Sequence, residues 1–287
     1  MIDNIKLLNL GCGCRYHPSW TNINFASTGE GVIAHDLQQG IPFPDQSFDV
    51  VYHSHVLEHF AKAEAEPFIK ECSRVLRPQG VLRVVVPDLE QIAKMYLHAL
   101  EQVSNGSLEW ADNYHWMLLE MYDQTVRNQS GGEMQAFISQ KEVANQEFVI
   151  KRCGVEIKNI ITAAQKQISA QNLTSKNVII KFLKHIYHLL RYRQYRRQEI
   201  VKQILSPQEL KALEIGQFRQ SGEVHQWMYD HYSLSVLLKN YGLEGVIKRT
   251  AFESYISNWT SFNLDTEPDG SIYKPDSFYM EAIKPVV

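Results

Sequence analysis

Short apolar runs rich in valine and isoleucine, each bounded by turn residues, recur through the first 90 residues of the chain. Runs this short are typical of parallel strands that are buried on both faces. Between the last two runs, Glu64 to Leu76 instead has helical spacing, with its apolar residues on one side. Strands that alternate with helices predict a parallel sheet with covered faces. The predicted strands are 7–10, 22–25, 32–34, 48–52 and 81–86.

The first connection of this predicted sheet is unusually short. Only seven residues, Cys14 to Trp20, separate Gly13 from the strand-like segment that begins at Thr21. A crossover between parallel strands normally takes about a dozen residues or more. We therefore expect the first crossover helix to be cut to about one turn or replaced by a loop.

The strand pattern disappears between about Asp88 and Gly222. A structureless connection of that length is implausible in a compact domain, so we predict a helical insertion. Its predicted helices are 88–103, 108–128, 132–169, 176–204 and 206–219. A helix over 233–241 and strands over 246–251 and 279–284 complete the pattern. The predicted fold is α/β, a doubly wound and mostly parallel seven-stranded sheet, with core segments 1–105 and 223–287 and an insertion over 106–222 that serves as substrate side or lid.

Composition narrows the classes of function. The chain has 287 residues and a formal net charge of -3, which gives no general attraction to nucleic acid, so no such partner is expected. Its four cysteines form no Cys-x-x-Cys pair that a following histidine pair could complete, so we expect no metal site. Neither a signal peptide nor a membrane-spanning apolar run is present, so a cytoplasmic location is the expectation.

The first predicted strand runs directly into Gly11, Cys12 and Gly13. Glycines at the carboxyl end of a strand let a ligand lie against the backbone, because no Cβ is in the way. The third glycine of a dinucleotide fingerprint is replaced by Tyr16, and the short crossover leaves little helix to receive a pyrophosphate. The loop therefore favours a ligand without phosphates.

Polar side chains follow the next strands in register. Asn24 ends the second strand, where its amide suits ribose hydroxyls, and Asp36 with Leu37 follows the third, where they suit an adenine ring. His53 and Ser54 stand at the mouth of the fourth strand. Each of these side chains alone is more simply a cap or a turn residue, but together they predict one shared site for an adenosine-type ligand.

Four segments carry a specific resemblance. LLNLGCG, HDL, IPFPDQSFDVVYHSHVLEHF and ECSRVLRPQGVLRVVVPDL, all within 6–90, resemble the type 11 branch of class I methyltransferases. The resemblance implies S-adenosylmethionine as cofactor, with Gly11 and Gly13 along its methionine and ribose, Asn24 at the ribose, and Asp36 with Leu37 at the adenine. It implies that the backbone around His53 and Ser54 faces the methionine amine. The sequence departs from the family at Asn24 and Asn9, where acids are usual.

The segments 121–134, 222–234 and 264–284 also resemble a bacterial subgroup of methyltransferases often encoded with surface-polysaccharide genes. The resulting hypothesis is an enzyme that methylates an oxygen of a sugar or glycan-type acceptor. A non-catalytic module that keeps the fold and binds the cofactor or another ligand, and a methyltransferase for small metabolites, are the alternatives. The sequence gives no prediction of oligomeric state.

An oxygen acceptor needs a base, because its proton must leave during or after attack. His225 and His55 are the candidates, since histidine titrates near neutral pH. Glu58, His59, Tyr229 and Asp230 are candidates for the substrate side. Each also has a structural interpretation: Glu58 and His59 as helix caps, and the segment around His225 as a packed hinge.

The segment 176–202 carries eight basic residues and one acid, interleaved with apolar residues. Such a basic amphipathic helix suits peripheral contact with the inner face of a membrane, which would fit a lipid-linked glycan acceptor. A helix with a solvated basic face is the simpler interpretation.

Overall fold

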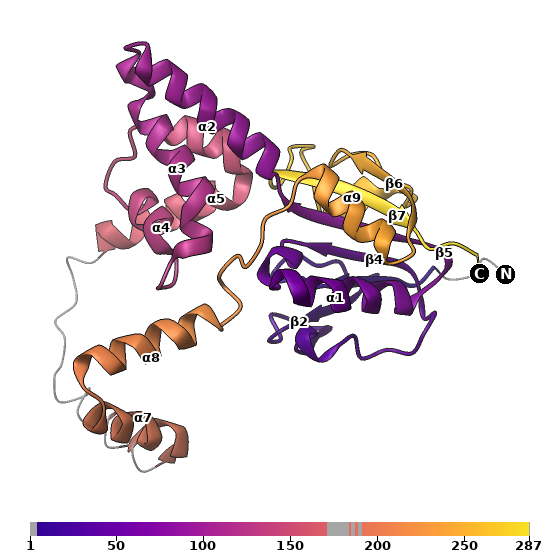
Figure 1. Ribbon diagram of the computed structural model, residues 1–287, viewed down its shortest axis with the longest axis horizontal. Helices are drawn as coiled ribbons and strands as arrows, with labels where there is room; N and C mark the ends of the chain where they lie inside the picture. Colours follow the sequence, from indigo (N-terminus) through magenta and orange to yellow (C-terminus); the bar gives the residue numbers. More distant parts are fainter. Residues whose placement is uncertain (1–4, 171–183, 185–186, 189–190, 287) are drawn as a thin grey trace.

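A computed structural model describes residues 5–170, 184, 187–188 and 191–286. They contain a seven-stranded sheet of order β3-β2-β1-β4-β5-β7-β6 (Figure 1). Strand β7 is antiparallel to both neighbours, and the other strand pairs are parallel. This confirms the predicted α/β fold. The strands are β1 (Leu7–Leu10), β2 (Thr21–Asn24), β3 (Val32–Ala34), β4 (Phe48–Ser54), β5 (Leu76–Pro87), β6 (Glu244–Arg249) and β7 (Ser277–Ile283).

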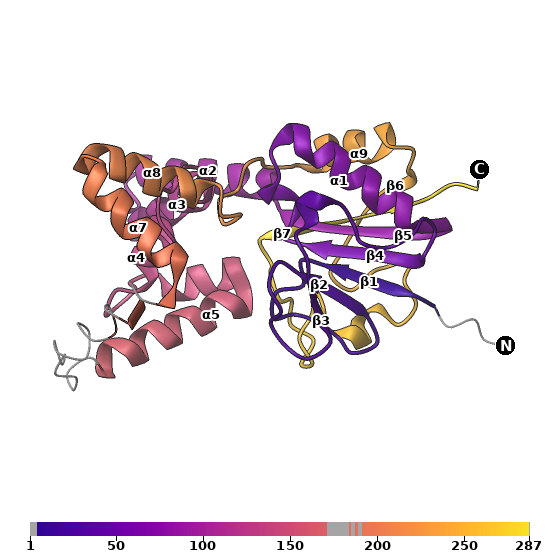
Figure 2. The same ribbon diagram turned by 90° about the horizontal axis from the view of Figure 1, so that it is seen from below.

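Helices α1 (Lys62–Val75) and α9 (His231–Asn240) cover one face of the sheet (Figure 2). The apolar side of α1, around Phe68 and Ile69, shares one hydrophobic cluster with Leu8 and Leu10, which alternate along β1 and so lie on the same face of the sheet. This cluster is the main hydrophobic core. It holds the central strands in register and so fixes the edge where their carboxyl ends meet.

The opposite face is covered by an aromatic segment instead of a layer of helices. Trp259, in the 3₁₀ turn η5 (Trp259–Phe262), packs with Trp20 and Tyr52. The ring of Trp20 stands edge-on to that of Tyr52 at 6.0 Å and to that of Trp259 at 6.1 Å. The first crossover contains no helix, as its length predicted, and the third contains only the 3₁₀ turn η1 (Leu37–Gln39).

A second hydrophobic cluster joins helices α2 (Leu89–Ser104), α3 (Ala111–Val126), α4 (Gly132–Ile138) and α5 (Gln146–Ala170) with the 3₁₀ turn η3 (Leu108–Trp110). Because Ile92 and Ala99 of α2 belong to it, the cluster begins directly after β5. The single helix expected over 132–169 was wrong. The chain leaves helical conformation between α4 and α5, and Gly154 interrupts α5 with a φ of 76°.

Helices α7 (Arg193–Ile204) and α8 (Pro207–Arg219) follow, and Ser206 caps α8 by accepting a hydrogen bond from the amide of Glu209. Of the basic segment 176–202, residues 176–183, 185–186 and 189–190 lie outside the described residues. Within the described part of the chain, no helix is both long and apolar enough to cross a membrane. The connection from α8 returns to the sheet at α9 (Figure 1).

Candidate functional site

A cavity of about 290 Å³ opens at the carboxyl ends of β1 and β4. This is the edge of a parallel sheet at which ligands usually bind. Gly11, Cys12, Gly13, Ser54 and His55 line it from the sheet side. Its opposite wall comes from α5 and from the segment before β7, through Glu156, Leu264, Tyr273 and Lys274. The structure thus brings the glycine loop, Ser54 and His55 together in one cavity. We refer to it as the first cavity.

The two glycines of the loop are required for different reasons. Gly11 has a φ of +63°, and a Cβ added there would lie 2.3 Å from Cγ2 of Val56. Gly13 has a φ of +54°, and an added Cβ would meet nothing within 4 Å. Gly11 therefore permits close packing against Val56, whereas the backbone of Gly13 is open to a ligand.

Asn24 braces the glycine loop. Its side-chain oxygen accepts a hydrogen bond from the amide of Gly13 at 3.2 Å, and its side-chain nitrogen donates to the carbonyl of Ala26 at 2.9 Å. Asn9 similarly donates to the carbonyl of Arg15 and to the side-chain oxygen of Asn22. Both positions need a donor, which an ionised carboxylate lacks. This explains physically why amides stand here in place of the usual acids.

Three further residues expected at the cofactor are not among those that line the first cavity. Asp36 caps η1 and accepts a hydrogen bond from the amide of Gln38 at 3.0 Å, and Leu37 packs against the main core. His53 is fully buried and edge-on to Phe68. Burial lowers the pKa of His53 to about 4, so its ring is neutral at physiological pH. Cys12 does line the cavity, and burial raises the pKa of its thiol to about 11.

A second cavity, of about 420 Å³, lies between the sheet edge and the helical cluster. Apolar side chains from α4 and α5 form part of its wall, including Met134, Ile138 and Ile157. Charged and amide side chains also line it: Glu120, Gln124, Arg127, Gln135, Glu156, Lys274 and Asp276. His55, Glu156 and Lys274 line both cavities. The two spaces therefore adjoin, with His55 on their common border.

His55 is held in a strained conformation directly after β4. It has a φ of +54°, which is uncommon for a residue with a side chain and is often associated with functional sites. Its Nε2 lies 2.7 Å from Oγ of Ser277, and its Nδ1 lies 3.2 Å from Oε1 of Glu58. Contacts at both ring nitrogens fix the orientation of the imidazole.

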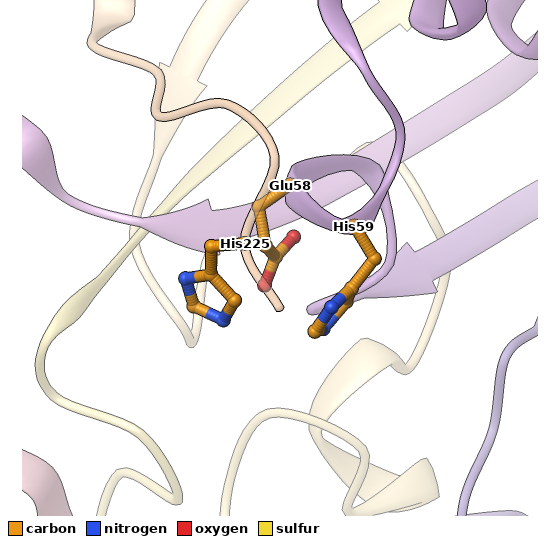
Figure 3. Close-up of side chains that lie close together, drawn as sticks. All are labelled: Glu58, His59 and His225. Atoms are coloured by element: carbon orange, nitrogen blue, oxygen red, sulfur yellow. The ribbon is translucent and has the colours of Figure 1, made fainter. Parts of the chain in front are cut away.

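Glu58, His59 and His225 form a cluster in which Glu58 and His225 are buried and His59 is half-buried (Figure 3). Glu58 and His59 belong to the 3₁₀ turn η2 (Leu57–His59), and His225 comes from the connection between α8 and α9. One ligand atom from each residue lies within 4.8 Å of the others. The spacing of cysteines and histidines predicted no metal site, but the fold brings together three residues with metal-ligating groups.

The ionisation of this cluster follows from its surroundings. Burial raises the pKa of Glu58, but contact with His55 and the nearby His225 and His59 outweigh it and bring the pKa below its ordinary value. Burial lowers the pKa of His225 to about 3. The carboxylate of Glu58 is thus charged at neutral pH and the imidazole of His225 is neutral.

Tyr229 and Asp230, expected on the substrate side, have structural contacts. Asp230 caps α9 by accepting a hydrogen bond from the amide of Ser233 at 2.7 Å. Tyr229 is buried in the main core, and its carbonyl accepts a hydrogen bond from the amide of Leu89 at 3.2 Å. Neither residue lines the first or the second cavity.

Buried ionic contacts support the far wall of the first cavity. Arg83 of β5 donates to Oδ2 of Asp265 at 2.9 Å and to Oε1 of Glu281 at 2.9 Å. The hydroxyl of Tyr52 donates to the other oxygen of Asp265 at 2.6 Å. Asp265 therefore anchors the wall segment next to Leu264.

Sequence reasoning missed several residues of both cavities, above all Glu156 and Lys274. Nζ of Lys274 lies 2.8 Å from Oε2 of Glu156, which joins the two walls. Glu156 lies inside a helix and Lys274 in a connection, and neither has a local motif. What marks the two residues is their ion pair, which links the insertion to the segment before β7. The pair can be recognised only once the fold is known.

Residues 10–84, which run from the end of β1 into β5, match the type 11 family model described as a methyltransferase domain. Residues 10–84 are therefore part of a methyltransferase domain. S-adenosylmethionine is the cofactor that this family implies, and the seven-stranded sheet with one antiparallel strand is typical of its fold.

Over 56 residues, 20% of this chain, the sequence is 43% identical to a protein of Mycolicibacterium smegmatis described as a "Probable S-adenosylmethionine-dependent methyltransferase". The match spans about a fifth, 21%, of that relative's length. A methyltransferase of Archaeoglobus fulgidus aligns with 98% of this chain and 86% of its own at 10% identity and a TM-score of 0.38. The [4+2]-cyclase SpnF aligns over 28% of this chain and 38% of its own at 23% identity and a TM-score of 0.24. The assignment of the methyltransferase domain rests on the family match and the sheet order.

Proposed function

We propose that this protein transfers a methyl group from S-adenosylmethionine to an oxygen of a sugar or glycan-type acceptor. The observation that carries the proposal is the pair of adjoining cavities with His55 on their common border. One cavity is built on the glycine loop of the methyltransferase domain, and the other is lined by the helical insertion. A two-substrate transfer needs two sites that meet at the reacting atoms.

The first cavity suits the cofactor. The open space at Gly13 is a cradle that a side chain would fill, and the backbone there is free to approach a ligand. Ser54 and the carboxylate of Glu156 line the same cavity and suit the polar methionine end. When bound, S-adenosylmethionine supplies a methyl group on a sulfonium, a good leaving group. The task of the chain is then to position the acceptor and exclude water.

The lining of the second cavity favours an acceptor with several hydroxyls. Carboxylates such as Glu120 and Asp276 accept hydrogen bonds, and Arg127 donates them. His55 borders both cavities and is the candidate base for the acceptor proton. His225 is a weaker candidate, because it is buried and its pKa is lowered to about 3. A link to surface-polysaccharide synthesis is part of the proposal and rests on the sequence resemblance.

Calorimetric titration with S-adenosylmethionine tests the proposal first. Saturable binding is expected, and absence of binding at millimolar concentration would leave only a non-catalytic module. Transfer of radiolabelled methyl groups to oligosaccharides and to small metabolites then identifies the acceptor class. Transfer only to a small metabolite would replace the glycan proposal.

The role of His55 needs a matched variant. His55→Asn is expected to lower kcat by roughly 100-fold or more, the usual contribution of a positioned base, with cofactor affinity nearly unchanged. His231→Asn is the control, because His231 is an exposed histidine that also contacts a carboxylate, with Nδ1 2.9 Å from Oε2 of Glu90. An unchanged kcat in His55→Asn would exclude His55 as the base.

Membrane contact through 176–202 is a separate proposal, supported by the basic composition of that segment. Vesicles that contain anionic lipid are expected to retain the wild-type chain. Neutralising Arg191, Arg193, Arg196 and Arg197 together is expected to abolish that retention. A wild-type chain that stays in solution would argue against a lipid-linked acceptor.

A further inference from the structure

We propose that Glu58, His59 and His225 bind a divalent transition-metal ion, with Zn²⁺ the best match to their ligand atoms. The three residues offer one carboxylate oxygen and two imidazole nitrogens, all within 4.8 Å of one another. This is the ligand set of catalytic zinc sites with three protein ligands and one open position. Figure 3 shows the carboxylate of Glu58 between the two rings.

Unpartnered polar atoms inside the cluster point to a missing ligand. Glu58 is fully buried, yet neither of its side-chain oxygens has a hydrogen-bond partner among the described residues. The ring nitrogen Nδ1 of His55 lies 3.2 Å from Oε1 of Glu58. Nδ1 of His225 is also buried without a partner there. Buried polar atoms normally have a partner, and a divalent cation would be a partner for the oxygens of Glu58 and for the free ring nitrogen of His225.

The backbone holds the ligands in place before any ion arrives. The carbonyl of Glu58 accepts hydrogen bonds from the amides of Gln226 at 2.7 Å and Trp227 at 3.2 Å. These bonds attach the connection that carries His225 directly to the turn that carries Glu58 and His59. Metal sites bind tightly when their ligands are preorganised in this way.

His59 has the outer contact that a ligating histidine usually makes. Its Nδ1 lies 3.4 Å from the carbonyl oxygen of Val224, a contact that fixes Nε2 as the free nitrogen. His59 is also only half-buried, which leaves an entry path for an ion. The two imidazoles favour zinc, cobalt or nickel over magnesium, which prefers oxygen ligands.

Metal content and affinity of the tag-free chain test this site without cofactor or acceptor, so the result is independent of the proposed methyl transfer. After treatment with a chelator, the chain is expected to take up about one equivalent of Zn²⁺ in equilibrium dialysis, and Mg²⁺ much more weakly. Co²⁺ is expected to give the intense visible absorption of a four- or five-coordinate site. Uptake of less than half an equivalent of Zn²⁺ would overturn the proposal.

Single variants locate the ion. Glu58→Gln keeps the shape of the side chain and removes its charge, and His59→Asn alters only the half-buried rim, so one folded variant remains available if the other fails to fold. Each is expected to weaken Zn²⁺ binding by about 100-fold or more, above the range seen when outer-shell partners are lost. His231→Ala, which removes the exposed histidine, is expected to bind as the wild type. Equal binding in all variants, or loss in His231→Ala, would place the ion elsewhere and refute the site.

Discussion

Arg83 is the residue whose removal is expected to cost the fold most. It is fully buried, with a nitrogen 2.7 Å from Asp265 and another 2.9 Å from Glu281, and it also donates to the carbonyls of Thr250 and Glu253. Arg83→Met would leave two buried carboxylates without their cation. Breaking a buried pair costs about 3–5 kcal/mol, so we expect the free energy of unfolding in urea to fall by at least about 3 kcal/mol.

Arg77→Met is the matched control, since Arg77 lies on the same strand and pairs with Asp49 at 2.9 Å. Both side chains of that pair are more than a third exposed, at 37% and 34%. Solvent screening limits such a pair to about 0–1 kcal/mol. A difference of less than about 1 kcal/mol between the two variants would refute our view that Arg83 holds the wall of the first cavity.

The pH dependence of Arg83→Met provides a second check. Burial already raises the pKa of Asp265, and Arg83 opposes that rise. Without Arg83, the folded pKa rises further above the unfolded value of about 3.9. Between the two values the folded state binds more protons than the unfolded state, so stability increases as the pH falls. The deficit of the variant should therefore shrink as the pH falls from 7.5 toward the unfolded value, and a constant deficit would contradict this account.

Further predictions concern the cavities and a helix cap. Gly11→Ala is expected to lower the midpoint of thermal unfolding more than Gly13→Ala. Both variants place alanine in the left-handed conformation, at a cost of about 1–2 kcal/mol, but only Gly11→Ala also brings a Cβ against Val56. Equal shifts would contradict this. Lys274→Met should flatten the acid limb of the stability curve. Lys274 holds the pKa of Glu156 below its ordinary value, although burial opposes this. The pair therefore stabilises the fold above about pH 4.3, and this stabilisation is lost as the pH falls. Urea unfolding of the variant and the wild type at pH 7 and pH 4 measures the difference. Ser206→Ala should cost about 1 kcal/mol at the start of α8 without changing cofactor affinity.

Much of the sheet could be predicted from the sequence because its strands are buried on both faces. The bounds of β1 and β3 agree with the expected ones, and the helix-free first crossover followed from its length. Strand β5, by contrast, begins at Leu76 and not at Val81. Residues 78–80 have the composition of a turn, but Gln79 donates to the carbonyl of Lys284 and Gly80 accepts from its amide. Pairing with the distant end of the chain overrides the local preference.

The candidate site was less predictable, since its parts come from distant segments. His55 and the glycine loop lie at strand ends, a position that the sequence reveals. Glu156 comes from a helix whose own bounds were misjudged, because the interruption at Gly154 depends on a tertiary contact: a Cβ there would lie 2.3 Å from the carbonyl oxygen of Tyr273. The approach of His225 to Glu58 likewise rests on backbone hydrogen bonds between separate segments.

Those backbone bonds also constrain how the second cavity can open. The amide of His225 donates to the carbonyl of Gln124 in α3 at 2.9 Å, and the next amide, that of Gln226, donates to Glu58 at the sheet edge. Two adjacent peptide groups therefore tie the helical cluster to the sheet. Any swing of the helices that widens the cavity must break one of these bonds or pull His225 away from Glu58. Widening of the second cavity and separation of His225 from Glu58 are thus coupled, and an ion bound to the proposed Glu58, His59 and His225 site would oppose both.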